Sequence, residues 1–152
     1  MIAKTTLNKI RSCDPCTSGW KSLLRYLGKT EADDEEITLL TVLESNGLDD
    51  ALWCLRASDA SDKEMRIYAV WCVRQVEHLM TDQRSKDALD VAERFANGQA
   101  TQEEFAAARA AARGAARAAW DAARAAAWGA AREDALESQK QKFIEIFCRG
   151  AQ

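Results

Sequence analysis

Proline and glycine, the residues that most readily interrupt a helix, are scarce in this chain. Its 152 residues include one proline and seven glycines, while 47% are hydrophobic. Proline removes a backbone donor and clashes inside a helix, and glycine costs about 1 kcal/mol there relative to alanine. No useful stretch alternates apolar and polar residues as a strand does. The sequence therefore predicts an all-α fold: one compact multi-helix domain over 1–152, with a long Ala-rich C-terminal helix or helix pair.

Residues 1–60 are expected to form short helices. Asp14 is expected to cap one of them, with Pro15 at its first position and Gly28 as its stop. The run EADDEE at 31–36 holds five acids just before an apolar stripe, where negative charge favours a helix N-terminus. The other signals are the stripe Ile37, Leu40 and Leu43, the stop Asn46-Gly47, and Asp49 or Asp50 as the next cap.

Residues 61–152 hold stronger helix signals. Ser61 and Glu64 form a capping box, and the helix expected over 62–80 contains IYAVWCV, which is apolar nearly all round and therefore expected to be central and buried. A further helix could run from 102 to about 148, with bends at glycines. The remaining signals are the cap Thr81 or Asp82, the stripe Ala88, Val91, Ala92 and Phe95, the stop Asn97-Gly98, the capping box Thr101 and Glu104, and the candidate bends Gly114 and Gly129.

The segment 118–132, AAWDAARAAAWGAAR, contains nine alanines. On a helical wheel, the large or charged residues of 109–132 lie within about 140°, and the opposite arc holds only alanine and glycine. The alanine face is expected to pack closely on another helix or in a homodimer. The other face either stabilises its own helix or binds a partner, since Arg and Trp are frequent in binding hot spots. Its candidate partner-binding residues are Arg117, Arg124, Trp128 and Arg132.

The charge distribution bears on the class of partner. The net charge is −3, which provides no overall basic signal for nucleic acid, although a nucleic-acid-binding helix with an Arg/Trp face remains the alternative. Clustered acids either solvate the surface and cap helices or form an anionic patch for a basic partner, such as a nuclease toxin or the nucleic-acid-binding surface of a defence complex. The candidate acids are Glu31, Asp33, Asp34, Glu35, Glu36, Asp49 and Asp50.

Cys13-Asp14-Pro15-Cys16 is a C-x-x-C motif. Cys16 is expected in the first turn of a helix, where the helix dipole lowers the pKa of a thiol, and this favours redox chemistry. Thioredoxin-like enzymes reach this motif from a strand, however, and zinc would need two more ligands. Ordinary free thiols are therefore the favoured interpretation. No phosphate-binding loop, nucleophile elbow or metalloprotease motif is present, so we expect no enzyme, no cofactor and no metal.

ALWCLRA (51–57), RIYAVWCVRQVEHLMTDQRSKDALDVAERFANGQAT (66–101) and the following Ala/Arg/Trp tract form a further pattern. It includes Trp71, Cys72, Arg74, Gln75, Val76, His78, Leu79, Asp82, Arg84, Ser85, Ala88, Ala92, Glu93, Arg94, Phe95, Ala96, Asn97 and Gly98. Over about 48–145 the chain resembles a helical family of immunity proteins of bacterial polymorphic toxin systems, which has phage and prophage relatives. The resemblance implies a stoichiometric inhibitor of a toxin or host defence complex, for example an anti-CRISPR protein. It supplies no catalytic residues.

Part of this pattern also has a structural interpretation. Arg74, Glu93 and Arg94 could form ion pairs between helices. The chain shows no signal peptide and no apolar run long enough to span a membrane, and it has five cysteines, an odd number. These features predict a cytoplasmic protein with reduced thiols, in the host cytoplasm if the protein is phage-encoded.

Overall fold

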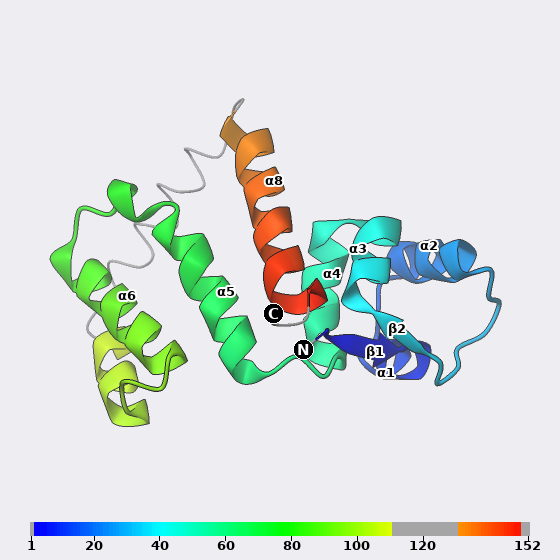
Figure 1. The fold of residues 1–152 in the computed structure, drawn as a ribbon, viewed down its shortest axis with the longest axis horizontal. Helices are drawn as coiled ribbons and strands as arrows, with labels where there is room; N and C mark the ends of the chain where they lie inside the picture. The colour runs from blue at the N-terminus through cyan, green and yellow to red at the C-terminus, as the bar shows by residue number, and fades with distance from the viewer. Residues whose placement is uncertain (1, 111–130, 150–152) are drawn as a thin grey trace. The chain divides into compact units, whose positions relative to one another are not determined.

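A computed structural model describes residues 2–110 and 131–149. The protein is mainly α-helical with a small two-stranded sheet, which confirms the predicted fold class apart from the sheet (Figure 1). The chain divides into two units. The first unit combines Met1–Ser61 with Lys140–Gln152, and the second unit is Asp62–Gln139. Within the described residues, no helix is long and apolar enough to cross a membrane.

The sheet pairs β1 (Lys4–Thr6) antiparallel with β2 (Glu36–Thr38), with Thr5 opposite Ile37. The sequence shows no alternating pattern at these positions, because three-residue strands are too short to produce one. Each strand leads directly into a helix. The side chain of Thr6 accepts from the backbone N–H of Lys9 and begins α1 (Leu7–Ser12). Thr38 caps α3 (Leu39–Asn46) in the same way. An N-cap residue adopts extended geometry, so it can also end a strand.

Two expected helix starts in the first unit are wrong. Asp14 has a positive φ of 55° and does not cap a helix; Cys16 caps α2 (Thr17–Leu27), which ends at Gly28 as predicted. The acidic run 31–36 leads into β2, and α3 has no acidic residue in its first turn. The reason is that Ile37 pairs with Thr5 across the sheet, so the backbone stays extended as far as Thr38.

The next helix, α4 (Leu48–Cys54), begins earlier than expected. Gly47 ends α3, as predicted, and is also the N-cap of α4. Asp49 and Asp50 therefore lie in the first turn of α4 and are not its cap. Carboxylates in this turn still stabilise the helix, because they interact favourably with the positive end of the helix dipole. A 3₁₀ turn, Leu55–Ala57, follows α4.

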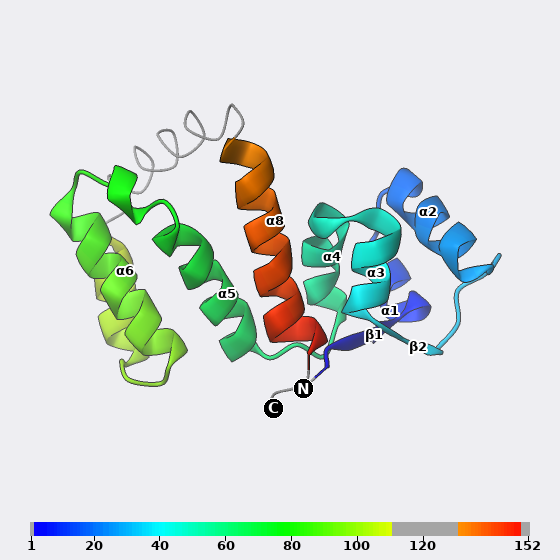
Figure 2. The ribbon, with the colours of Figure 1, turned by 45° about the horizontal axis from the view of Figure 1, so that its top comes forward.

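Both ends of the chain form the core of the first unit. The C-terminal end of α8 (Ala131–Phe143) continues into a π-helical turn, Ile144–Cys148. Phe143 and Phe147 are both 0% exposed, with ring centroids 5.0 Å apart. The backbone N–H of Ala3 donates to the carbonyl of Phe147 at 2.7 Å. The π-helical turn that follows α8 thus lies beside the start of β1 (Figure 2) and helps to close a core that includes Leu7 and Leu39.

The second unit contains α5 (Asp62–Arg74), a 3₁₀ turn at Glu77–Leu79, and α6 (Gln83–Ala96), with α5 packed on α6. Two expectations for α5 were wrong. It ends at Arg74 instead of continuing to about 80, and within it only Tyr68 is buried, so it is not a central buried helix. Helix α6 packs against α5, and the hydroxyl of Tyr68 donates to the carbonyl of Gln139 in α8, yet the rest of the apolar run stays half-buried or exposed.

Three further helix-end signals of the second unit are confirmed. Asp82 caps α6, and Asn97 is its C-cap. The backbone N–H of Glu104 donates to Thr101 Oγ1, and that of Thr101 donates to Glu104 Oε2, which is the predicted capping box. Residues 102–110 are helical. The alanine face of 111–130 and its candidate bends, Gly114 and Gly129, lie outside the described residues.

Candidate functional site

The acidic loop, residues 31–36, is held in place between α2 and β2. The backbone N–H of Asn8 donates to the carbonyl of Asp33 at 3.0 Å. The ammonium of Lys29 lies 2.6 Å from Oδ2 of Asp33 and 2.6 Å from Oε2 of Glu35. This hydrogen bond from Lys29 lowers the pKa of Asp33 below its ordinary value, with a smaller contribution from the backbone N–H of Glu35. The loop is therefore an anchored structure and not a loose acidic tail.

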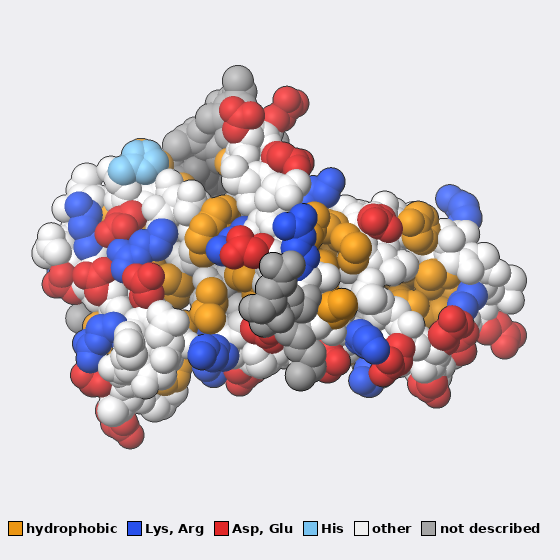
Figure 3. All heavy atoms as spheres, viewed as in Figure 1, with side chains coloured by type: hydrophobic (Ala, Val, Ile, Leu, Met, Phe, Trp, Pro, Cys, Tyr) orange, Lys and Arg blue, Asp and Glu red, His pale blue; other side chains and the backbone are white. Residues whose placement is uncertain are grey.

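The acidic loop keeps excess negative charge. Lys4 pairs with Glu36 across the two strands at 2.7 Å. Five carboxylates against two lysines leave a formal charge of −3. Glu31 and Asp34 are exposed and form no ion pair with any described residue. Figure 3 shows acidic side chains gathered over this end of the first unit.

The other predicted acids do not join this loop. Asp50 Oδ2 accepts a hydrogen bond of 2.7 Å from Nδ2 of Asn46, which also donates to the carbonyl of Gly19 at 2.8 Å. Gly19 lies in the first turn of α2, whereas the acidic loop follows the last turn. The 11 residues of α2 separate these two ends by about 16 Å. Asp50 and the exposed Asp49 therefore form a second, separate acidic group.

The predicted Arg/Trp face has no described geometry. Arg117, Arg124 and Trp128 lie outside the described residues, and Arg132 belongs to α8 without a described side chain. The nucleic-acid-binding alternative depends on this face and so stays a prediction. Arg109, the one arginine of the face that is fully described, is exposed.

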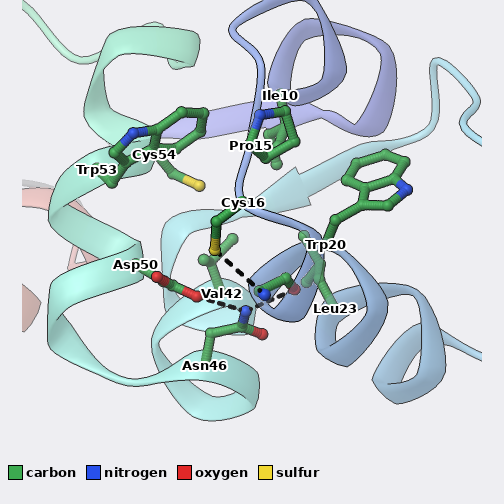
Figure 4. Close-up of a pocket in the computed structure, with 11 residues that line it drawn as sticks. Ile10, Pro15, Cys16, Trp20, Leu23, Val42, Asn46, Asp50, Trp53 and Cys54 are labelled. Carbon is green, nitrogen blue, oxygen red and sulfur yellow. Dashed lines mark hydrogen bonds between the residues drawn. The ribbon is translucent and has the colours of Figure 1, made fainter.

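A small cavity of about 80 Å³ lies within the first unit, between the turn that precedes α2 and the helices α2, α3 and α4 (Figure 4). Its lining is mostly apolar. In the view of Figure 4, Trp20 and Trp53 lie on opposite sides of Cys16. The other apolar lining residues are Ile10, Pro15, Leu23 and Val42, and the polar ones include Asn46 and Asp50.

Cys16 differs chemically from Cys54, which lines the same cavity. Cys16 is exposed, and its sulfur accepts from the backbone N–H of Gly19 at 3.4 Å and contacts Ser18 Oγ at 3.5 Å. The Ser18 contact, followed by the Gly19 N–H, lowers the pKa of the Cys16 thiol. Burial raises the pKa of Cys54 to about 12. Cys16 is thus the more acidic and more accessible thiol.

The state of the other cysteines and the placement of potential metal ligands bear on the chemistry of the C-x-x-C motif. All five cysteines are free thiols, and burial also raises the pKa of Cys72 and that of Cys148, the latter to about 11. In the parts of the chain that the structure describes, no three His, Cys, Asp or Glu side chains are placed to hold a metal ion. Cys16 is the helix cap, while Cys13 ends the preceding helix, α1.

Sequence reasoning missed the cavity and the Asn46–Asp50 contact with α2. One residue offered a weak signal: Gly19 lies inside a helix, where glycine is unfavourable. A Cβ atom added at Gly19 would lie 2.5 Å from Oδ2 of Asp50, so the close approach of α4 explains the glycine. Nothing local in the sequence identifies Asp50 as that neighbour, because 31 positions separate the two residues.

Comparison with known proteins assigns no family to this chain. No protein-family model matches this chain, and neither a curated protein nor a solved structure matches it.

Proposed function

We propose that this protein is a non-enzymatic inhibitor that binds a protein partner stoichiometrically, as an immunity or phage anti-defence protein, and that the acidic loop is part of its binding surface. The observation that carries the proposal is the anchoring of this loop by Lys29 and by the backbone of Asn8. A loop that is already ordered loses less conformational entropy when it binds, so more of its interaction energy appears as affinity.

The charge of the loop indicates the chemistry of the partner. Its exposed carboxylates, Glu31 and Asp34, complement a surface rich in Lys and Arg. Such a surface occurs on nucleases and on the nucleic-acid-binding sites of defence complexes, where an acidic inhibitor would compete with phosphate groups. Complementary charge chiefly raises the association rate, and salt screens this effect over a Debye length of about 8 Å at physiological ionic strength.

The test reverses the two exposed charges. The double variant Glu31→Lys/Asp34→Lys leaves the bonds of Asp33 and Lys29 intact. A matched control, Asp87→Lys/Glu103→Lys, makes the same charge change at exposed sites of the second unit. Tagged wild-type protein and both variants are used as bait in bacterial lysate, and captured proteins are quantified by mass spectrometry. The captured protein is then purified for binding kinetics at low and high salt.

We expect a basic protein that the wild type and the control capture equally, and an association rate about tenfold lower for the loop variant at low salt. The difference should shrink at high salt. If the loop variant captures the protein as well as the wild type does and binds it at the same rate, the acidic loop is not part of the binding surface. Salt-sensitive binding of DNA or RNA without any captured protein would contradict protein binding and support the Arg/Trp alternative.

A further inference from the structure

The cavity of the first unit brings an apolar lining next to a reactive thiol. Pro15, Trp20 and Leu23 line it together with Cys16, while Cys54 lines the same space from α4. The volume of about 80 Å³ exceeds the roughly 10–15 Å³ that a cavity needs to hold a single water. A short alkyl group fits this space and would remove apolar surface from water.

The surroundings of Cys16 favour one type of reaction. Cys16 is exposed, and its sulfur accepts the Gly19 N–H at the first turn of α2, where the helix dipole also stabilises negative charge. The negative charge of the lining carboxylate, Asp50, opposes the thiolate less than the two hydrogen bonds stabilise it, and the lining contains no histidine or lysine to move a proton. Thiol exchange at sulfur needs no such group, because it requires only a thiolate and a stable leaving group.

We propose that the cavity binds the alkyl group of a small sulfur electrophile, an organic disulfide or thiosulfonate, and that Cys16 forms a mixed disulfide with it. The Cys16 thiolate attacks the sulfur that carries the alkyl group. A new sulfur–sulfur bond forms as the bond to the leaving group breaks. The leaving group departs with the electron pair as a thiolate or sulfinate, and a thiolate then takes a proton from solvent. Cys16 is oxidised to the disulfide level and the electrophile is reduced.

The two cysteines of the cavity have different roles in this proposal. Cys54 is 4% exposed and remains protonated, so it forms part of the wall and does not compete for the electrophile. Cys13, half-buried at the end of α1, is the natural comparison, because it is three residues from Cys16 but is not among the lining residues. The proposed thiol exchange takes place at the N-terminal end of α2, whereas the acidic loop follows the C-terminal end of this helix. The exchange therefore goes beyond the proposed function.

The experiment compares two reagents that share one leaving group. Propyl methanethiosulfonate carries an apolar group, and 2-sulfonatoethyl methanethiosulfonate carries a charged group of similar length. Labelling rates of the wild type, Cys16→Ser and Cys13→Ser are followed by intact mass, and the modified residue is identified by peptide mapping. N-acetylcysteine amide supplies the reference ratio of the two rates for a thiol without a cavity.

We expect Cys16 to be the first residue labelled, with a propyl-to-sulfonatoethyl rate ratio about tenfold above the reference. Cys16→Ser should lose this fast phase and Cys13→Ser should keep it. The labelling rate should also reach half its maximum at a lower pH than for the reference thiol. A ratio equal to the reference, or labelling of Cys13 as fast as Cys16, would overturn the proposal. Peptide mapping of the wild type identifies the cysteine that is labelled first even if a variant does not fold.

Discussion

The two units are stabilised by different kinds of contact. In the first unit, side chains from both ends of the chain are fully buried, including Leu7, Leu39 and the two C-terminal phenylalanines. In the described residues of the second unit, the buried side chains are Tyr68, Ser85, Leu89 and Ala96. The first unit thus depends chiefly on apolar burial between distant segments, which is the dominant favourable contribution to folding.

Charged and aromatic contacts are more prominent in the second unit. The guanidinium of Arg74 in α5 pairs with Asp90 at 2.7 Å and with Glu93, both in α6, and with Glu77 at 3.0 Å. The Arg74–Glu93 pair confirms the predicted link between these helices. Phe95 stacks on Phe105 with ring centroids 4.7 Å apart. The residues of these contacts lie 3 to 19 positions apart in the sequence, whereas the Ala3–Phe147 bond of the first unit closes a loop of more than a hundred residues.

The largest expected effect tests the difference in burial. Phe147→Ala should lower the free energy of unfolding of the first unit by about 3–5 kcal/mol, because it leaves a cavity in a closely packed core. The matched change in the second unit, Phe105→Ala, affects a half-buried ring and should cost about 1–2 kcal/mol. Urea unfolding measures both, and hydrogen exchange identifies which unit loses protection. Equal losses would contradict the contrast between the units.

A smaller effect tests the ion pairs of the second unit. Arg74→Gln leaves three carboxylates without their shared cation and should cost about 1–3 kcal/mol. The control Arg84→Gln removes a more exposed arginine, whose ion pair is with Asp82, and should cost less than Arg74→Gln because solvent screens that pair. Urea unfolding at low and high NaCl should show the Arg74 difference shrinking with salt. If both variants unfold at the same urea concentration, the Arg74 pairs do not stabilise this unit.

The smallest effect concerns pH and the α6 cap. The hydrogen bond from Arg84 lowers the pKa of Asp82 below its ordinary value of 3.8. A carboxyl with a lower pKa in the folded state adds stability above the unfolded value, and this stability is lost as pH falls through the folded value. The urea concentration at the unfolding midpoint of the wild type should therefore fall from pH 6 to pH 3. That of Asp82→Asn should fall less. An identical drop in both proteins would show that Asp82 does not contribute.

Sequence reasoning was most accurate where a structural feature depends on neighbouring residues. Gly28, Asn46-Gly47, Asp82 and the Thr101 capping box end or begin helices as predicted, because each contact spans a few positions. It failed where a distant segment decides the conformation. Thr38, and not an acid of 31–36, caps α3 because β1 pairs with the residues before it.

For the candidate sites, the sequence identified the residues but not their arrangement. It placed the acids of 31–36 and Asp50 in one patch, and the length of α2 separates them. It identified Cys16 as the cysteine at a helix start, although it expected Asp14 as the cap. It did not identify the cavity, because its walls come from four helices, α1 to α4, whose packing leaves no local pattern.

The sequence by itself determined the helical class and many helix ends, since low proline and glycine content and capping residues act within one or two turns. Only the tertiary structure decided that Phe143 and Phe147 complete the core of the N-terminal unit, that the acidic loop is held by Lys29 and Asn8, and that Cys16 borders a cavity. Most of these features depend on contacts between residues far apart in the chain. Such contacts form only when burial of apolar surface brings the segments together.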